Sequence, residues 1–344
     1  MTGGRTLPFD QWPATDQAAW VRATARRDSP FRRHGGGRTL SPSTVRSTAA
    51  GNGRWLGYLD SIGELDPSVP PDQRATADRL DAYFQHLRDC GNADTTVVNR
   101  FVQLRAALQL LVPDQDHRWI TRPRGISLRQ MLPMKRRDRP LHLTNELLDW
   151  ARATFRAGLA HHKPRCRRAL VRDGAMMGIL AMPAPRLRAL TSLELGRHLQ
   201  RRDDGWFLDL DASVMKTGAA QGCPLLPEAS AMLDRYIEVE RNEMLNGTAH
   251  ERLWISRHGT PLSEAGIVGQ LRNGSLRRFG HRVGPHAFRH GLGSTAALEG
   301  YASPLDGSIL LGHADPQTTI DYYNRAKATA ASLRHSERLR RLRG

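Results

Sequence analysis

Two side chains suited to phosphate chemistry stand three residues apart in GPHAFRHGLGSTAALEG, residues 284–300. At this spacing His286 and Arg289 share one face of a helix, because residues three apart are neighbours on a helical surface. An imidazole and a guanidinium held together near a helix N-terminus form a grip for a phosphate group. By itself the pair is a weak signal, since a chance surface pair has the same spacing.

A second candidate, ILLGHADPQTTIDYY at residues 309–323, ends in two adjacent tyrosines. At about 100° per residue on a helix, Tyr323 lies about 60° from Ile320 and Tyr322 about 160° from it. If Ile320 points into the core, Tyr323 packs beside it. Tyr322 then projects outward from the other face, and the helical phase alone does not say which tyrosine, if either, does chemistry.

Together these pieces resemble the motifs of the tyrosine recombinase, or phage integrase, family of DNA strand-exchange enzymes. HxxRH, LGH and TTxxY follow one another, and the tyrosine stands nine residues beyond the histidine of LGH. APRLRALTSL resembles the family's first arginine segment, and KTGAAQGCPLL resembles its lysine-bearing hairpin. The resemblance covers residues 145–325. It assigns six catalytic residues: Arg186, Lys216, His286, Arg289, His313 and Tyr322.

The first arginine segment departs from the family pattern at two positions. Pro185 stands where a glycine is usual, and Ala189 stands where an acidic residue is usual. Arg188 is therefore an alternative to Arg186. The hairpin also lacks the basic residue that commonly follows KTG, so an ordinary turn lysine is the alternative interpretation of Lys216.

The resemblance implies a type IB reaction that cleaves and rejoins DNA. Arg186 and Arg289 would clamp the phosphate oxygens with bidentate, permanently charged donors. Tyr322 would attack the phosphorus and leave a 3′-phosphotyrosyl bond. Lys216 would protonate the leaving 5′-hydroxyl, and His286 would accept the proton of the tyrosine.

The remaining histidine and the cofactor question complete the implied mechanism. His313 would bond the phosphate, with a purely supporting role as the alternative. The sequence offers no carboxylate cluster of the kind that holds Mg²⁺ in nucleases, so we expect neither a metal nor another cofactor. A type IB topoisomerase that relaxes DNA is the alternative enzyme. The alternative outside enzymes is a DNA-binding relative that has lost catalysis.

The elements that must position these residues form two parts. Apolar residues at helical spacing predict a helical domain over residues 41–125, where the resembled family keeps its core-binding domain. Helices and a short antiparallel ribbon around KTG predict the catalytic domain over residues 144–330. The expected fold class is mainly α with a small antiparallel β-sheet, in the two-domain architecture of tyrosine recombinases.

Three basic segments complete the predicted organisation. Residues 1–40, rich in Gly, Arg and Pro, predict a largely flexible N-terminal arm, interrupted by a short helix in ATDQAAWVRATARR. Residues 126–143 predict a linker between the domains. Residues 331–344 form a basic C-terminal tail. In the resembled family such a tail packs onto a neighbouring protomer, so the resemblance implies a tetramer on two DNA sites.

Composition fits this interpretation. Lys and Arg exceed Asp and Glu by 17, which indicates a polyanionic partner, and the resemblance makes that partner double-stranded DNA. Cys90, Cys166 and Cys223 show no CxxC spacing, which favours neither disulfides nor zinc. No apolar run approaches the roughly 18 residues of a membrane span. We therefore expect a soluble cytoplasmic protein with no membrane contact.

Overall fold

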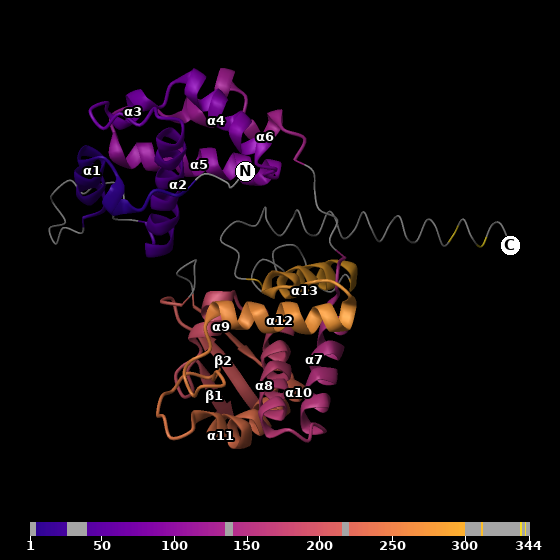
Figure 1. Ribbon diagram of the computed structural model, residues 1–344. Coiled ribbons are helices and arrows are strands. Elements are labelled where there is room, and N and C mark those ends of the chain that lie inside the picture. The colour runs from indigo at the N-terminus through magenta and orange to yellow at the C-terminus, as the bar shows by residue number, and fades with distance from the viewer. Residues whose placement is uncertain are drawn as a thin grey trace. The chain divides into compact units, whose positions relative to one another are not determined.

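The chain divides into two compact units, with the boundary between Asp138 and Arg139, inside the segment predicted as a linker. The computed structural model describes residues 5–25, 40–134, 140–214 and 220–299, together with residues 311, 338 and 341. Both units are mainly helical, and the second contains a three-stranded antiparallel sheet (Figure 1). The predicted fold class is therefore confirmed.

The first unit is built from helices whose apolar faces meet in one core. Its largest contact joins α2 and α5, and Trp55 of α2 meets Tyr83 of α4 edge to face, with ring centroids 5.2 Å apart. The elements are the short 3₁₀ helices Phe9–Gln11, Arg118–Ile120 and Pro123–Gly125, and the α-helices α1 (Ala14–Thr24), α2 (Pro42–Ser61), α3 (Pro71–Arg74), α4 (Ala77–Asp89), α5 (Asp94–Leu111) and α6 (Leu128–Met131).

The prediction of a flexible arm over residues 1–40 is wrong for residues 5–25. Trp12 and Trp20 are buried in the core of the first unit and meet edge to face at 5.5 Å. The chain ahead of them lies on α2, where a Cβ at Gly57 would stand 1.7 Å from the carbonyl oxygen of Arg5. Glycine is unfavourable inside a helix, but its lack of a Cβ gives this segment room to pack directly on α2.

A buried ion pair holds α1 in the first unit. Both guanidinium Nη atoms of Arg74, in α3, donate to the carboxylate of Asp16, in α1, at 2.9 and 2.6 Å. The two side chains are 1% and 0% exposed. The bidentate geometry satisfies both charges away from water, which is the condition under which a buried pair is tolerated.

The second unit contains the site residues that the structure describes. Its helices are α7 (Thr144–Leu159), α8 (Pro164–Ala181), α9 (Leu187–Ser192), α10 (Pro227–Arg235), a π-helical turn (Tyr236–Arg241), α11 (Asn242–Leu245), α12 (Glu264–Phe279) and α13 (Pro285–Glu299). Figure 1 shows α7 and α8 side by side, with α9, α12 and α13 at one end of this pair and α11 at the other. The end with α9 and α13 is therefore the end that carries the site.

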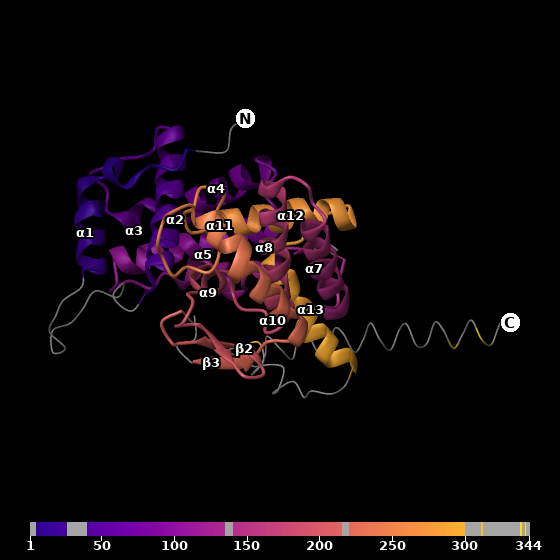
Figure 2. The same cartoon turned by 90° about the horizontal axis from the view of Figure 1, so that it is seen from below.

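The sheet lies at one edge of the second unit, beside α10 (Figure 2). Its strands are β1 (Leu199–Arg202), β2 (Gly205–Leu210) and β3 (Gln221–Pro224), in that order, and both pairs are antiparallel. The ribbon predicted around KTG is confirmed as β2 and β3, whereas β1 was not anticipated. In the described part of the chain no helix is long and apolar enough to cross a bilayer.

Candidate functional site

Arg289 is the buried arginine of the candidate site. It lies on α13 between Phe288 and Leu292, which face the core, and it is 9% exposed. One Nη atom donates to the carbonyl oxygen of Ala184 at 2.6 Å, and the other donates to the carbonyl oxygen of Leu311. The guanidinium is thus fixed by two backbone segments distant from it in the sequence.

Arg186 lies beside this anchor, two residues after Ala184. It is the N-cap of α9, where its extended backbone supplies the carbonyl for the first helical hydrogen bond, to Leu190. Ala184 is fully buried and has a φ of +56°, which costs an L-residue about 1 kcal/mol or more. The hydrogen bond from Arg289 stabilises this turn, so one arginine fixes the backbone that positions the other.

His286 is close enough to Arg289 and Arg186 for their positive charges to act on it. It stands in the first turn of α13 and is exposed at the surface. Partial burial lowers its pKa, and the positive charges of Arg289 and Arg186 lower it further. Burial also lowers the pKa of the Arg186 guanidinium. The three side chains therefore form one positively charged cluster in which the imidazole favours its neutral form.

The two candidates for the first arginine differ in their surroundings. The charge of Arg186 acts on His286, which places Arg186 at the cluster. Arg188 lies on an exposed position of α9. This arrangement favours Arg186 over Arg188 as the partner of Arg289.

Leu311 brings the second motif to the same place. It stands two residues before His313, is 1% exposed, and packs with Ala184 and Leu292 in a small apolar cluster. Its carbonyl accepts the hydrogen bond from Arg289. The start of the LGH motif therefore lies against the arginine cluster.

Three predicted site residues, Lys216, His313 and Tyr322, lie outside the described residues. Strands β2 and β3 pair on either side of the KTG segment, with Leu210 opposite Gln221 at the last described pair. The assignments of these three residues stay predictions.

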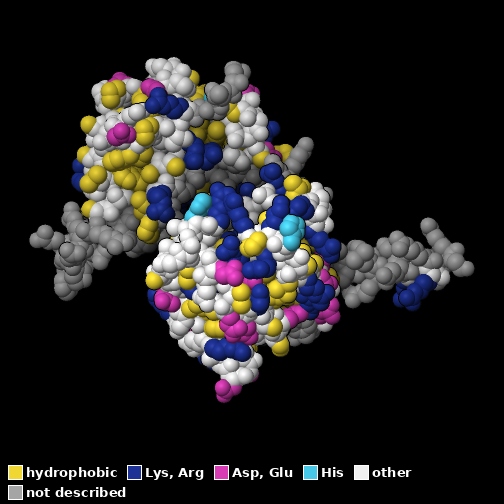
Figure 3. All heavy atoms as spheres, turned by 60° about the horizontal axis from the view of Figure 1, so that its bottom comes forward, with side chains coloured by type: hydrophobic (Ala, Val, Ile, Leu, Met, Phe, Trp, Pro, Cys, Tyr) yellow, Lys and Arg dark blue, Asp and Glu magenta, His cyan; other side chains and the backbone are white. Residues whose placement is uncertain are grey.

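Two features complete the surroundings of the site. Among the described residues, no group of three or more His, Cys, Asp and Glu side chains is arranged to hold a metal ion. Lys and Arg side chains gather on the face of the second unit shown in Figure 3.

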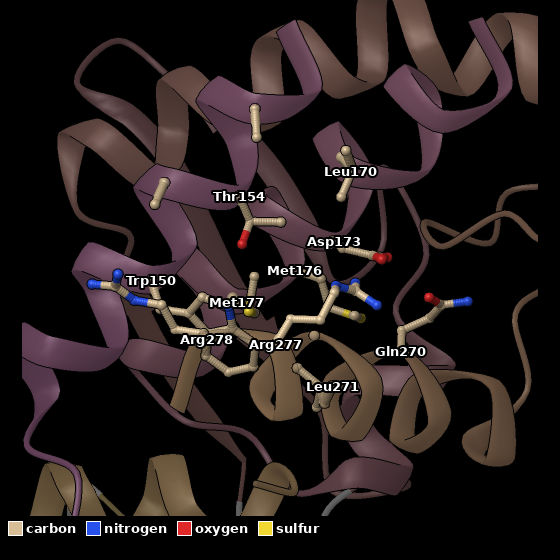
Figure 4. Close-up of a pocket in the computed structure, with 13 residues that line it drawn as sticks. Trp150, Thr154, Leu170, Asp173, Met176, Met177, Gln270, Leu271, Arg277 and Arg278 are labelled. Carbon is tan, nitrogen blue, oxygen red and sulfur yellow. The ribbon is translucent and has the colours of Figure 1, made fainter. Parts of the chain in front are cut away.

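A cavity of about 250 Å³ opens between α7, α8 and α12 (Figure 4). Figure 4 shows Asp173 and Arg277 at its polar side and Trp150 and Met177 among its apolar walls. Burial raises the pKa of Asp173 against the opposing charge of Arg172. Neither Arg186, His286 nor Arg289 lines this cavity, so it is separate from the arginine cluster.

Sequence reasoning missed the backbone acceptors of Arg289. Ala184 and Leu311 contribute only carbonyl oxygens, which every residue carries, so no residue type marks them. The available signal was positional: both stand two residues from a predicted site residue, Arg186 or His313.

Comparisons with known proteins identify relatives of this chain. The phage integrase family model matches residues 136–329, more than half of the chain. Tyrosine recombinase XerD of Chlorobaculum tepidum is 26% identical over 292 residues, covering 83% of this chain and 86% of the relative. XerD of Halalkalibacterium halodurans is 22% identical over 288 residues, covering 83% and 88%.

A solved structure shares the fold. The XerH site-specific recombinase, crystallised as a post-cleavage complex with a palindromic difH substrate, superposes with a TM-score of 0.60 at 13% identity. The superposition covers 96% of this chain and 98% of that one. With the family model spanning the arginine cluster, the chain belongs to the phage integrase family and is a tyrosine-type recombinase.

Proposed function

We propose that this protein is a site-specific DNA recombinase that cleaves and rejoins DNA through a 3′-phosphotyrosyl intermediate, in the integration, excision or resolution of a mobile element. The observation that carries the proposal is the cluster of Arg186, His286 and Arg289, held at one place by the hydrogen bonds of Arg289 to Ala184 and Leu311. The positive charge of this cluster would stabilise an anion whose charge is delocalised, such as a phosphodiester in its transition state.

The two arginines would bind the scissile phosphate. A guanidinium has five donors in a rigid fork, a geometry that suits the recognition of phosphate oxygens. Fixed donors need no reorganisation when charge develops, which is the main source of catalytic power in such sites. A phosphate-binding role would account for the burial of Arg289 in the candidate site.

His286 would act as the general base. Its lowered pKa keeps the imidazole neutral at neutral pH, and only the neutral ring accepts a proton. In the forward step the Tyr322 oxygen bonds to phosphorus, the bond from phosphorus to the 5′ oxygen breaks, and the tyrosine proton passes to His286. Lys216 protonates the leaving 5′ oxygen, and His313 donates to the phosphate.

The partner would be double-stranded DNA. The excess of 17 basic residues and the basic face in Figure 3 favour phosphate contacts, and the XerH relative was crystallised with a DNA substrate. We infer that the first unit binds DNA as the core-binding domain does in the family. Four protomers would assemble on two sites in the cytoplasm, with the tail at residues 331–344 as an intersubunit contact.

A suicide-substrate assay tests the proposal. Nicked duplexes covering the DNA that flanks the coding sequence are incubated with the full chain, and covalent complexes are resolved on a denaturing gel. We expect an adduct on a small subset of duplexes, in which cleavage leaves a free 5′-hydroxyl. The absence of an adduct on every duplex would contradict the proposal.

Strand exchange separates the recombinase from a topoisomerase. Two duplexes that carry the same reactive site and different fluorophores are mixed with the protein. A recombinase joins strands from the two duplexes, whereas a topoisomerase reseals each duplex to itself. An adduct without joined products would support the topoisomerase alternative.

A further inference from the structure

Two histidines of the second unit form a hydrogen-bonded chain outside the arginine cluster. His142 stands just before α7, and its Nε2 is 2.9 Å from the Nε2 of His281, in the loop between α12 and α13. The Nδ1 of His142 is 2.9 Å from a carboxylate oxygen of Glu146. The Nδ1 of His281 is 2.9 Å from the carbonyl oxygen of Phe279. Three hydrogen bonds thus connect four groups in series.

Counting donors fixes the protonation of this chain. The Phe279 carbonyl only accepts, so the Nδ1 of His281 carries a proton. One Nε2 must donate to the other, and an ionised Glu146 requires a proton on the Nδ1 of His142. Three bonds therefore need three ring protons, whereas two neutral imidazoles supply two. With Glu146 ionised, the histidine pair therefore shares one additional proton, whose charge Glu146 balances, whereas a protonated Glu146 would itself supply the third proton and leave both rings neutral.

The hydrogen-bonded series from Glu146 to Phe279 lies in a tightly packed part of the second unit. His142 is 6% exposed, and its ring lies against Phe279 with centroids 4.3 Å apart. A Cβ at Gly291 in α13 would stand 2.6 Å from the carbonyl oxygen of His142. The backbone at the start of α7 therefore lies directly on α13. A change at His142 has little room to relax without moving α13.

The loop that carries His281 leads directly into the candidate site. It starts at Gly280, the left-handed cap of α12, and Val283 donates to the Ser275 hydroxyl at 2.7 Å. Two residues after Val283, α13 begins, and its first turns carry His286 and Arg289. A contact at His281 thus fixes the loop that sets the N-terminus of α13.

We propose that His142 and His281 share one proton, and that this proton holds the loop 280–284 and the start of α13 in the position that places His286 and Arg289. The consequence for DNA cleavage rests on the proposed function, whereas the shared proton does not. His142 and His281 are positioning residues, because they act through the loop and not on the substrate.

The proton makes this contact sensitive to pH. When rising pH removes the third proton, two nitrogen lone pairs face each other at the contact between the rings, and the chain loses one bond. At low pH a fourth proton makes two N–H groups face each other. The charged groups on the packed elements are Glu146 on α7, Arg278 at the end of α12, Arg282 in the loop, and His286, Arg289 and His290 on α13. Glu146 accepts from the pair and favours the protonated state.

Nuclear magnetic resonance of ¹⁵N-histidine-labelled full chain tests the proton without DNA. His142→Gln and His281→Gln assign the signals, and measurements with and without a chelator exclude a metal ion between the rings. We expect three ring protons on the pair near neutral pH, and a changed spectrum of either ring when the other is replaced. Two rings that titrate independently, or signals that move on chelation, would overturn the proposal.

A conservative variant tests the link to the site. Glu146→Gln keeps an oxygen acceptor for His142 and removes the balancing charge, so the variant should hold the third proton less firmly than the wild type. We expect the alkaline fall in the rate of covalent complex formation to move to lower pH accordingly. His250→Gln, in which the replaced ring is 3.1 Å from the Gly259 carbonyl in the same unit, is the matched control and should leave the profile unchanged.

The two readouts separate the possible failures. If the proton is present and the rate profile of Glu146→Gln equals that of the wild type, the positioning role is wrong. If the wild-type chain forms no adduct with any duplex, the proposed function fails, and the resonance measurement still decides the shared proton.

Discussion

Two buried arginines, Arg74 of the first unit and Arg289 of the second, are held in different ways. Arg74 in the first unit is 1% exposed and donates both Nη atoms to the carboxylate of Asp16. Arg289 in the second unit is 9% exposed and donates to the backbone carbonyls of Ala184 and Leu311. A carboxylate cancels the positive charge, whereas carbonyl dipoles hold the group and leave its field acting on His286.

The difference separates an arginine used for folding from one used for binding. A charge neutralised inside the fold can contribute stability and fix one helix to another, as Arg74 does for α1. Neutral carbonyl oxygens do not cancel the charge of Arg289, which still acts on His286. Neither burial nor carbonyl acceptors alone identify a functional arginine, because Arg241 is 6% exposed and donates to the carbonyls of His250 and Arg252 outside the candidate site. Arg289 differs from Arg241 in that its charge acts on His286.

The largest expected effect is on cleavage by Arg289→Lys. Lysine keeps the charge and loses the rigid fork that holds both carbonyls and the phosphate together. We expect the rate of covalent complex formation to fall by about 10²–10³-fold, with the fold retained. Single-turnover gel assays measure the rate, and circular dichroism checks the fold. A rate within a few-fold of the wild type would remove the distinction between the two arginines.

The next effect is on stability in Arg74→Met. The substitution leaves the Asp16 carboxylate buried without its partner, which should lower the free energy of unfolding by about 3–5 kcal/mol. Urea unfolding of the full chain, followed by tryptophan fluorescence, measures the loss, because Trp12 and Trp20 lie in the affected core. Cleavage per folded molecule should remain at the wild-type level, and a large loss there would show that Arg74 also serves the site.

A double variant, Arg74→Met with Asp16→Leu, sharpens this point. Replacing a buried ion pair by apolar side chains of similar volume is often neutral for stability. We expect the double variant to recover most of the stability that Arg74→Met loses. Unfolding under the same conditions compares the two, and an additive loss would mean that the charges themselves are required.

The smallest expected effect is on the pKa of His286. The charge of Arg186 lowers this pKa, so Arg186→Gln should raise it towards the ordinary histidine value. The sign also predicts that acidification through the lowered pKa protonates His286 and slows wild-type cleavage. Proton resonance titration of the histidine ring measures the pKa. No change in Arg186→Gln would place the first arginine elsewhere, and Arg188→Gln is the matched control.

Much of the fold could be predicted from patterns in the sequence. The alternation of apolar and polar residues around KTG predicted an antiparallel ribbon, and β2 and β3 pair there. The arm prediction failed because Gly, Arg and Pro dominate residues 1–40, while two buried tryptophans outweigh that composition. Gly57 also shows why local propensity is an incomplete guide. A glycine inside a helix predicts a weaker helix, but here the lack of a Cβ lets the backbone of Arg5 pack against α2.

The candidate site likewise combines residues that the sequence predicts with contacts that only the fold reveals. The spacing of His286 and Arg289 places them on one helix face, and the family resemblance added Arg186 from a distant segment. The hydrogen bond from Arg289 to Ala184 joins residues 105 apart, and the contact between His142 and His281 joins residues 139 apart, which no local pattern predicts. Contacts made by backbone atoms, or by common residue types across such distances, appear only with the fold.

The most direct test of the central claim is which tyrosine becomes linked to DNA. Covalent complexes formed by the wild type, Tyr322→Phe and Tyr323→Phe are compared on nicked duplexes, and the wild-type adduct is digested and located by mass spectrometry. We predict a 3′-phosphate on Tyr322, no adduct in Tyr322→Phe, and an adduct in Tyr323→Phe. An adduct that persists in Tyr322→Phe and disappears in Tyr323→Phe would contradict the account.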